Sequence, residues 1–264
     1  MASLDSLWRA RALLPLAAAL LAALALGCRG GGEAPQVPSQ LPPVQEEEPG
    51  VPREVEDELR SILARWGSRD ARIVYKVSTV SGGVREEADL LFQWRPAQRQ
   101  WRMDIAIVGG ESGSIINDGQ GLYLCDDAEH LCFKFSAEDS PVAPLPFVSD
   151  SQVLADPVAV AEAILEQLRE GRTQVSSRTI ANLAARCFTS TSIAGLGGVL
   201  EKLEVCLAVD TALLLRAEAL APAQGGRQDR SLFEATQVSG EVAANAFDPP
   251  YEVVDTEATP EGGS

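Results

Sequence analysis

Between residues 125 and 206, four cysteines and one histidine are of the types that could bind a metal or act in catalysis. They are Cys125, Cys132, Cys187, Cys206 and His130. Their spacings fit no zinc-binding pattern, so we expect no metal and no cofactor. An even number of cysteines instead predicts disulfides, provided that the chain is exported. Four cysteines allow three pairings, and the sequence spacing alone does not choose among them.

A fifth cysteine, Cys28, ends an apolar segment near the start of the chain. A short charged stretch precedes this segment, which runs from Ala12 to Gly27 and is built mostly of Ala and Leu. Its length of about 16 residues is below the ~20 that a membrane-spanning helix needs and is typical of a signal-peptide core. Ala25-Leu26-Gly27-Cys28 resembles the lipobox of bacterial lipoproteins, although Ala25 and Leu26 depart from the commonest order. The resemblance implies a signal peptide over 1–27 and acylation of Cys28.

Acylation at Cys28 would fix the location of the protein. Two or three acyl chains hold a protein stably to a membrane, whereas one chain is marginal. We therefore expect an exported protein, anchored to the outer face of the cell membrane or to a periplasmic or outer-membrane leaflet. An ordinary cleaved signal and an uncleaved single-span anchor are the alternatives.

Few other groups could support catalysis. Asp126-Asp127 and Glu129 surround His130 on an expected turn, which is more typical of a solvated loop than of an acid–base pair. The glycines between Gly195 and Gly198 lack the Lys-Ser/Thr pair of a phosphate-binding loop. We therefore expect that the protein is not an enzyme.

Composition and charge divide the chain and exclude some partners. The net charge of −16 argues against nucleic acid and against a basic patch that docks on anionic lipid head groups. Residues 28–53 are rich in Pro, Gly and Glu and predict a flexible tether, because they hold too little apolar surface to fold. Residues 54–250 predict one folded domain, and the acidic residues 251–264 predict a disordered tail.

The folded part combines helices with alternating strands. Amphipathic patterns predict helices over Glu54–Trp66 and from Asp156 to Gly171. Alternating apolar residues predict early strands around Ile73–Val77, Ala88–Trp94, Trp101–Ile107, Leu122–Leu124 and Leu131–Phe135, and later ones at Thr179–Thr191, Glu201–Asp210, Ala212–Leu220 and Arg230–Val238. We expect an α+β fold: a strongly curved antiparallel sheet, or open half-barrel, with two or three helices closing its concave face.

The strand register favours one disulfide pairing. A turn near Ala128-Glu129 would set Cys125 opposite Cys132, and a turn among the glycines near Gly197 would set Cys187 opposite Cys206. In both hairpins the cysteines would point outward. Each bridge would contribute roughly 2–3 kcal/mol to stability.

Several short motifs resemble one bacterial family. They are Leu91-Phe92-Gln93-Trp94-Arg95-Pro96, Trp101-Arg102, Ile116-Asn117-Asp118-Gly119, Leu122-Tyr123 and Phe247-Asp248-Pro249-Pro250. Together they look like the bacterial lipoprotein-carrier superfamily, which includes LolA/LolB-like proteins and LppX/LprG-like lipoproteins. The resemblance covers most of Val55 to Val254 and implies an open half-barrel with an apolar cavity for acyl chains. The cysteines and the lipobox fit an anchored member better than a soluble carrier.

The resemblance implies a set of residues that line the cavity. They are Tyr75, Phe92, Trp94, Met103, Ile105, Leu124, Phe133, Phe135, Val205, Leu207 and Leu215. The same residues would equally form an ordinary core, and only an unfilled cavity would distinguish the two. We therefore expect a lipoprotein that binds lipid or acylated ligands for transfer within the envelope. The alternative is an envelope sensor or regulatory lipoprotein that binds a protein partner.

Overall fold

A single antiparallel sheet with one parallel edge strand dominates the computed structural model, which describes residues 51–135, 157–169, 171–195, 198–223 and 227–255. The first half of the chain contributes β1 (Ala71–Ser81), β2 (Val84–Arg95), β3 (Gln100–Ile107), β4 (Ser112–Asn117), β5 (Leu122–Asp126) and β6 (Leu131–Phe135). The second half contains β7 (Arg172–Ile180), β8 (Leu183–Gly195), β9 (Gly198–Ala208), β10 (Leu214–Leu220), β11 (Arg230–Ser239) and β12 (Glu252–Asp255). A short 3-10 helix, Pro96–Gln98, joins β2 to β3.

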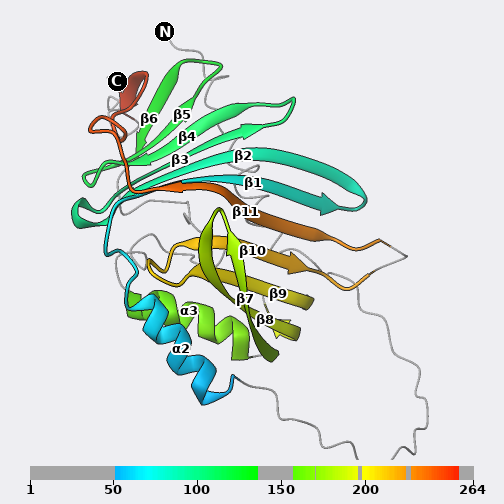
Figure 1. Cartoon of the computed structure of the whole chain (residues 1–264). Helices are drawn as coiled ribbons and strands as arrows, with labels where there is room; N and C mark the ends of the chain where they lie inside the picture. Colours follow the sequence, from blue (N-terminus) through cyan, green and yellow to red (C-terminus); the bar gives the residue numbers. More distant parts are fainter. Residues whose placement is uncertain (1–50, 136–156, 170, 196–197, 224–226, 256–264) are drawn as a thin grey trace, which may run out of the picture.

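The sheet is open, as the sequence predicts. Its strands follow the order β12-β6-β5-β4-β3-β2-β1-β11-β10-β9-β8-β7, so that β12 and β7 form its two edges. Strand direction turns continuously from β6 to β10, and the sheet is strongly twisted (Figure 1). The β1–β11 pair joins the two halves of the chain.

Two α-helices lie together beside one end of this sheet (Figure 1). In α2 (Arg53–Leu63), Glu54 and Glu56 occupy the first turn, where carboxylates interact favourably with the helix dipole. Leu59, Ile62 and Leu63 are buried. The helix α3 (Pro157–Arg169) begins at a proline, which is favourable at a first helical position. Its expected cap, Asp156, lies outside the described residues. Neither of the helices in the described part is long and apolar enough to cross a membrane.

The helix α3 contacts β8 and β7, and α2 packs against α3. Ser190 on β8 donates a hydrogen bond to the carbonyl of Leu168 at 3.1 Å, and Arg186 binds Glu58 of α2 at 2.6 Å. After α2, Trp66 packs against Trp94 of β2 with ring centroids 4.9 Å apart. The sequence predicts that helices close the concave face of the sheet. In the described residues, helices cover this face at one end of the sheet.

Side-chain chemistry explains the turn between β4 and β5. Asn117 Oδ1 accepts a hydrogen bond from the Gly119 amide at 2.8 Å, and Asp118 Oδ1 accepts one from Gly121 at 2.8 Å. Gly119 has φ +90°, and a Cβ there would lie 2.9 Å from the Gln98 carbonyl oxygen. Glycine is therefore required both for conformation and for space.

Three sequence predictions need correction. The expected strand Thr179–Thr191 is two strands, because the backbone turns at Ala181 and Asn182, which have φ of 49° and 64°. The strand expected from Ala212 begins at Leu214, since Ala212 also has positive φ. The tail expected from 251 contains β12, which pairs with β6 in parallel. The signal segment 1–27, Cys28 and the tether up to residue 50 lie outside the described residues.

Candidate functional site

The strand register gathers the predicted lining residues on one face of the sheet. Tyr75 lies opposite Leu90, which lies opposite Ile105. Continuing across the sheet, the pairs Met103–Ile115, Ile115–Leu124 and Leu124–Phe133 extend the same face to β6. In the other direction Phe233 lies opposite Ala217, and Ala217 lies opposite Val205. We call this surface, which runs from Phe133 to Phe188, the apolar face.

Every predicted lining residue except Leu215 has a place in this register. By alternation along their strands, the apolar face also includes Phe92, Trp94, Phe135 and Leu207. Leu215 lies at the irregularity in β10 between Leu214 and Arg216, and its side chain is fully buried. The structure therefore brings these residues together, while their role in ligand binding stays a prediction.

Burial of the apolar face changes from one end to the other. At the helix end Phe188, Val205 and Leu207 have exposed fractions of 0%, 1% and 0%. At the β3–β6 end Ile115 and Phe133 are also buried, with exposed fractions of 3% and 7%, but their neighbours Ile105, Leu124 and Phe135 are only partly buried. The apolar face is thus wider than the surface that α2 and α3 cover.

Two polar groups on this face, Tyr75 and Ser190, are bound within the protein. The Tyr75 hydroxyl donates a hydrogen bond to the Leu214 carbonyl at 2.7 Å, and burial raises the pKa of Tyr75. Ser190 donates to Leu168, as described above. With their hydrogen bonds made, these groups present mainly hydrocarbon to anything that contacts the face.

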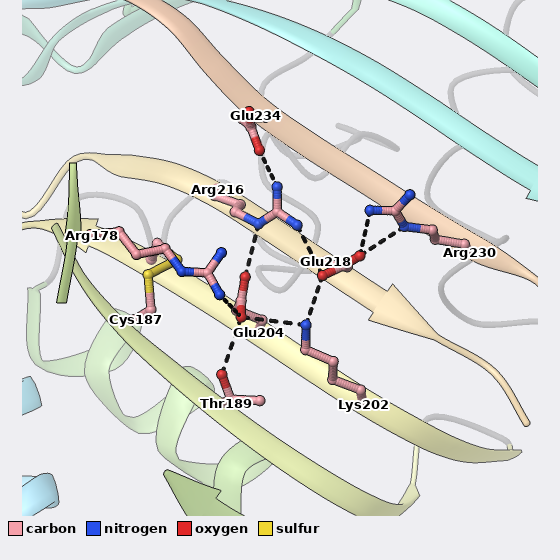
Figure 2. Close-up of polar contacts among 10 residues, drawn as sticks. Arg178, Cys187, Thr189, Lys202, Glu204, Arg216, Glu218, Arg230 and Glu234 are labelled. Atoms are coloured by element: carbon pink, nitrogen blue, oxygen red, sulfur yellow. Dashed lines mark hydrogen bonds and ion pairs between the residues drawn. A yellow bond between two sulfur atoms is a disulfide. The ribbon is translucent and has the colours of Figure 1, made fainter. Parts of the chain in front are cut away.

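The opposite face of β7 to β11 carries a charge network, which Figure 2 shows. Arg216 lies at its centre: Nε binds Glu204 at 2.8 Å, Nη2 binds Glu218 at 3.0 Å, and Nη1 binds Glu234. The two carboxylates Glu204 and Glu218 are buried, and longer basic side chains cover them. Arg178 binds Glu204 at 3.0 Å, and Lys202 binds Glu218 at 2.8 Å.

This network keeps its carboxylates ionised. Burial acts to raise the pKa of Glu218, but hydrogen bonds from Lys202, Arg230 and Arg216 outweigh it and lower the pKa to about 2. The pKa of Glu204 is also lowered, because Arg216 and its other cationic neighbours outweigh the opposing effect of burial. Each buried charge has several partners, so the network is structural and leaves no carboxylate free for acid–base chemistry.

Both expected disulfides are present. Cys125 pairs with Cys132 and Cys187 pairs with Cys206, in each case between residues directly opposite in the register. The cysteines lie on the face opposite the apolar face, as predicted, yet all four have exposed fractions of 0%. Burial comes from neighbouring side chains, which the sequence pattern does not reveal.

The C-terminal segment covers the first disulfide. Ala246 and Phe247 are buried in a small second cluster with Cys125 and Cys132. The Arg95 guanidinium lies 5.0 Å from the centre of the Phe247 ring, a cation–π distance.

Ser114 Oγ, on the strand beside Cys125, is buried and has no hydrogen-bond partner in the described part of the chain.

His130 lies on the exposed turn between β5 and β6 rather than in a site. Its ring stacks on Tyr251 with centroids 5.0 Å apart, and Tyr251 donates a hydrogen bond to Asp127 at 3.0 Å. Among the described residues no group of three or more His, Cys, Asp or Glu could hold a metal ion. The turn therefore anchors the C-terminal segment.

Comparison with known proteins gives matches at the level of structure. A scan against models of protein families finds no match, and a search of curated proteins finds none. The solved structures that are similar include LprF from Mycobacterium bovis, with 12% identity and a TM-score of 0.42. That match covers 76% of this chain and 99% of LprF.

Two further solved structures come from other bacteria. A LolA superfamily protein from Nitrosomonas europaea is 8% identical over 72% of this chain and 96% of its own, with a TM-score of 0.33. A chain of the Pseudomonas aeruginosa MucA/MucB complex is 14% identical, with a TM-score of 0.40; the match covers 72% of this chain but 58% of that one. The family expected from the sequence is thus represented among the solved structures to which this chain is similar.

Proposed function

We propose that this chain is an exported lipoprotein, anchored through Cys28, that binds acyl chains of a lipid or acylated ligand on its apolar face. One observation carries the proposal: the apolar face extends past the helices to Ile105, Leu124 and Phe135, which remain partly exposed. Burying such side chains against hydrocarbon removes apolar area from water, worth about 25 cal/mol per Å².

Three other properties of the chain are compatible with this function. Met103 on the same face is flexible and adapts to irregular hydrocarbon. The expected tether over 28–53 would hold the domain away from its membrane while leaving it free to reorient. In the described part of the chain the Tyr75 and Ser190 hydroxyls on this face donate hydrogen bonds to backbone carbonyls, and we propose that the ligand is held and passed on unchanged.

A fatty-acid titration tests the proposal. The full chain in detergent would be titrated with a dansyl-labelled fatty acid, and saturable binding is expected. Leu124→Glu should weaken binding at least tenfold, because a carboxylate on the face would be desolvated by the acyl chain. Val108→Glu is the matched control, since Val108 is already 67% exposed on the turn after β3. If both variants are folded, as judged by circular dichroism, and bind the fatty acid equally well, the apolar face is not the binding site.

A second function, binding of a protein partner, is supported by a different feature. The edge strand β7 is exposed along most of its length. Both functions are compatible in one protein, because the β7 edge and the β3–β6 end of the apolar face lie at opposite ends of the strand order.

A further inference from the structure

The two edges of the sheet differ in how they are protected. The β12 edge is a strand of four residues that includes Glu252 and Asp255. The β7 edge has nine residues, and all nine pair with β8 without a register shift. A long regular edge strand presents a row of backbone donors and acceptors on which another chain can pair.

The sequence of β7 has little of the usual protection of an edge. Proteins block edges with Pro, charged side chains (Lys above all), inward-pointing charges or bulges, and of these β7 has only its two arginines. Between Arg172 and Ile180 the strand has no proline, lysine or carboxylate, and its residues are mostly Thr, Ser, Val and Gln. The helix α3 contacts β7 near its start, where Thr173 Oγ1 donates to the Leu168 carbonyl at 3.1 Å. Most of the remaining strand is exposed.

Two arginines give this edge a positive charge within a chain of net charge −16. Every second residue of a strand points to the same face. Arg172 and Arg178 therefore share one face of β7, with Gln174 and Ser176 between them. Arg172 is exposed and makes no ion pair with the residues that the structure describes. Arg178 is 44% exposed at its side chain and, in the described part of the chain, makes one ion pair, from Nη2 to Glu204 at 3.0 Å.

The same charges disfavour pairing between two copies of β7. An antiparallel pair centred on Val175 would set Arg172 of each copy opposite Arg178 of the other. Like charges directly opposite each other destabilise a strand pair. A strand with carboxylates at those two positions would be stabilised instead, because each would face an arginine.

We propose that β7 accepts an extended acidic segment of a partner protein as an added antiparallel strand, with two carboxylates six residues apart facing Arg172 and Arg178. The backbone ladder supplies affinity, and the two arginines set the register. The interaction does not depend on lipid binding, because it uses the strand edge rather than the apolar face.

A pair of short peptides tests this interaction on the full chain. The probe is the capped heptapeptide Glu-Thr-Thr-Val-Thr-Thr-Glu, which places Val opposite Val175 and a Glu opposite each arginine. The control probe replaces both Glu residues with Lys. Hydrogen exchange, followed by mass spectrometry of fragments that cover 172–180, reports directly on the backbone amides of β7.

The Glu probe should slow exchange in β7, and the Lys probe should not. Arg172→Glu should weaken binding of the Glu probe roughly three- to tenfold, as expected when one attractive cross-strand pair becomes repulsive. Arg172→Gln should give an intermediate loss. Arg69→Glu, the same change at an exposed arginine before β1, should leave binding unchanged.

Three results would overturn the proposal. The first is binding of the Glu probe with no change in β7 exchange, or no binding at all. The second is equal binding of both probes, which would remove the role of charge. The third is protection of β7 that rises with protein concentration in the absence of probe, which would identify a second copy of the chain as the occupant. Each of these outcomes leaves the fatty-acid titration unaffected.

Discussion

Replacing Glu218 with Gln tests the charge network on the outer face of the sheet. Glu218 is 5% exposed and accepts hydrogen bonds from Lys202, Arg216 and Arg230. Glutamine keeps the size of the side chain and reproduces the neutral state of the acid. The variant should therefore behave as the wild-type protein does when Glu218 is protonated.

The size of the effect follows from the pKa of Glu218. Although burial opposes it, the cationic neighbours lower the pKa from 4.5 to about 2. At 1.36 kcal/mol per pKa unit, the ionised group contributes roughly 3 kcal/mol to the free energy of unfolding at pH 7. Because the pKa is lowered in the folded state, this contribution is present above about pH 4.5 and is lost as the pH falls towards 2. The difference between wild type and variant should shrink over that same window.

Urea unfolding at pH 7, 5, 4 and 3, followed by tryptophan fluorescence, measures this difference. Trp66, Trp94 and Trp101 are buried and should report the loss of the fold. Glu201→Gln is the matched control on β9, because Glu201 is exposed and bonds only Gln228 in the described part of the chain; it should change stability by less than about 0.5 kcal/mol. The reasoning would be contradicted if the free energies of unfolding of wild type and Glu218→Gln differed by less than about 1 kcal/mol at pH 7. It would also be contradicted if this difference did not vary with pH.

The disulfides and one turn give further predictions. Replacing both Cys187 and Cys206 with Ala should cost about 3 kcal/mol, and replacing Cys125 and Cys132 should cost about 2 kcal/mol, because the closed loops differ in length. Urea unfolding of each double variant checks the order, and a larger loss for the shorter loop would argue against the loop-closure explanation. Ala181→Gly should raise the melting temperature, since Ala181 has φ 49° and glycine relieves about 1 kcal/mol of strain there. A lower melting temperature would show that the turn does not strain alanine.

Alternation along the strands allowed the apolar face to be predicted from the sequence. Residues such as Phe92, Met103 and Leu124 occupy every second position of their strands, and antiparallel register then carries the face from strand to strand. The disulfides followed from the same register. The helices leave part of this face partly exposed. Tertiary packing decides which part, and the alternation pattern of the sequence does not predict it.

Other features were missed for identifiable reasons. The β7–β8 turn has neither Gly nor Pro, and Asn182, which tolerates positive φ, was its only sequence signal. The strand β12 is exposed at every position, so backbone pairing defines it and side-chain alternation does not. Glu204 and Glu218 occupy positions that alternation assigns to solvent. Their burial depends on the basic side chains that cover them, and a polar pattern predicts no such cover.

Native mass spectrometry tests the central proposal, acyl-chain binding on the apolar face, most directly. The full chain would be purified from membranes in detergent, and its mass would be measured before and after denaturation. Acyl chains bonded to Cys28 would remain after denaturation, whereas a lipid held on the apolar face would be released. We predict an additional lipid mass in the native spectrum that disappears on denaturation and is reduced in Leu124→Glu but not in Val108→Glu. Identical native and denatured masses, for a wild-type protein that is folded, would contradict the proposed function.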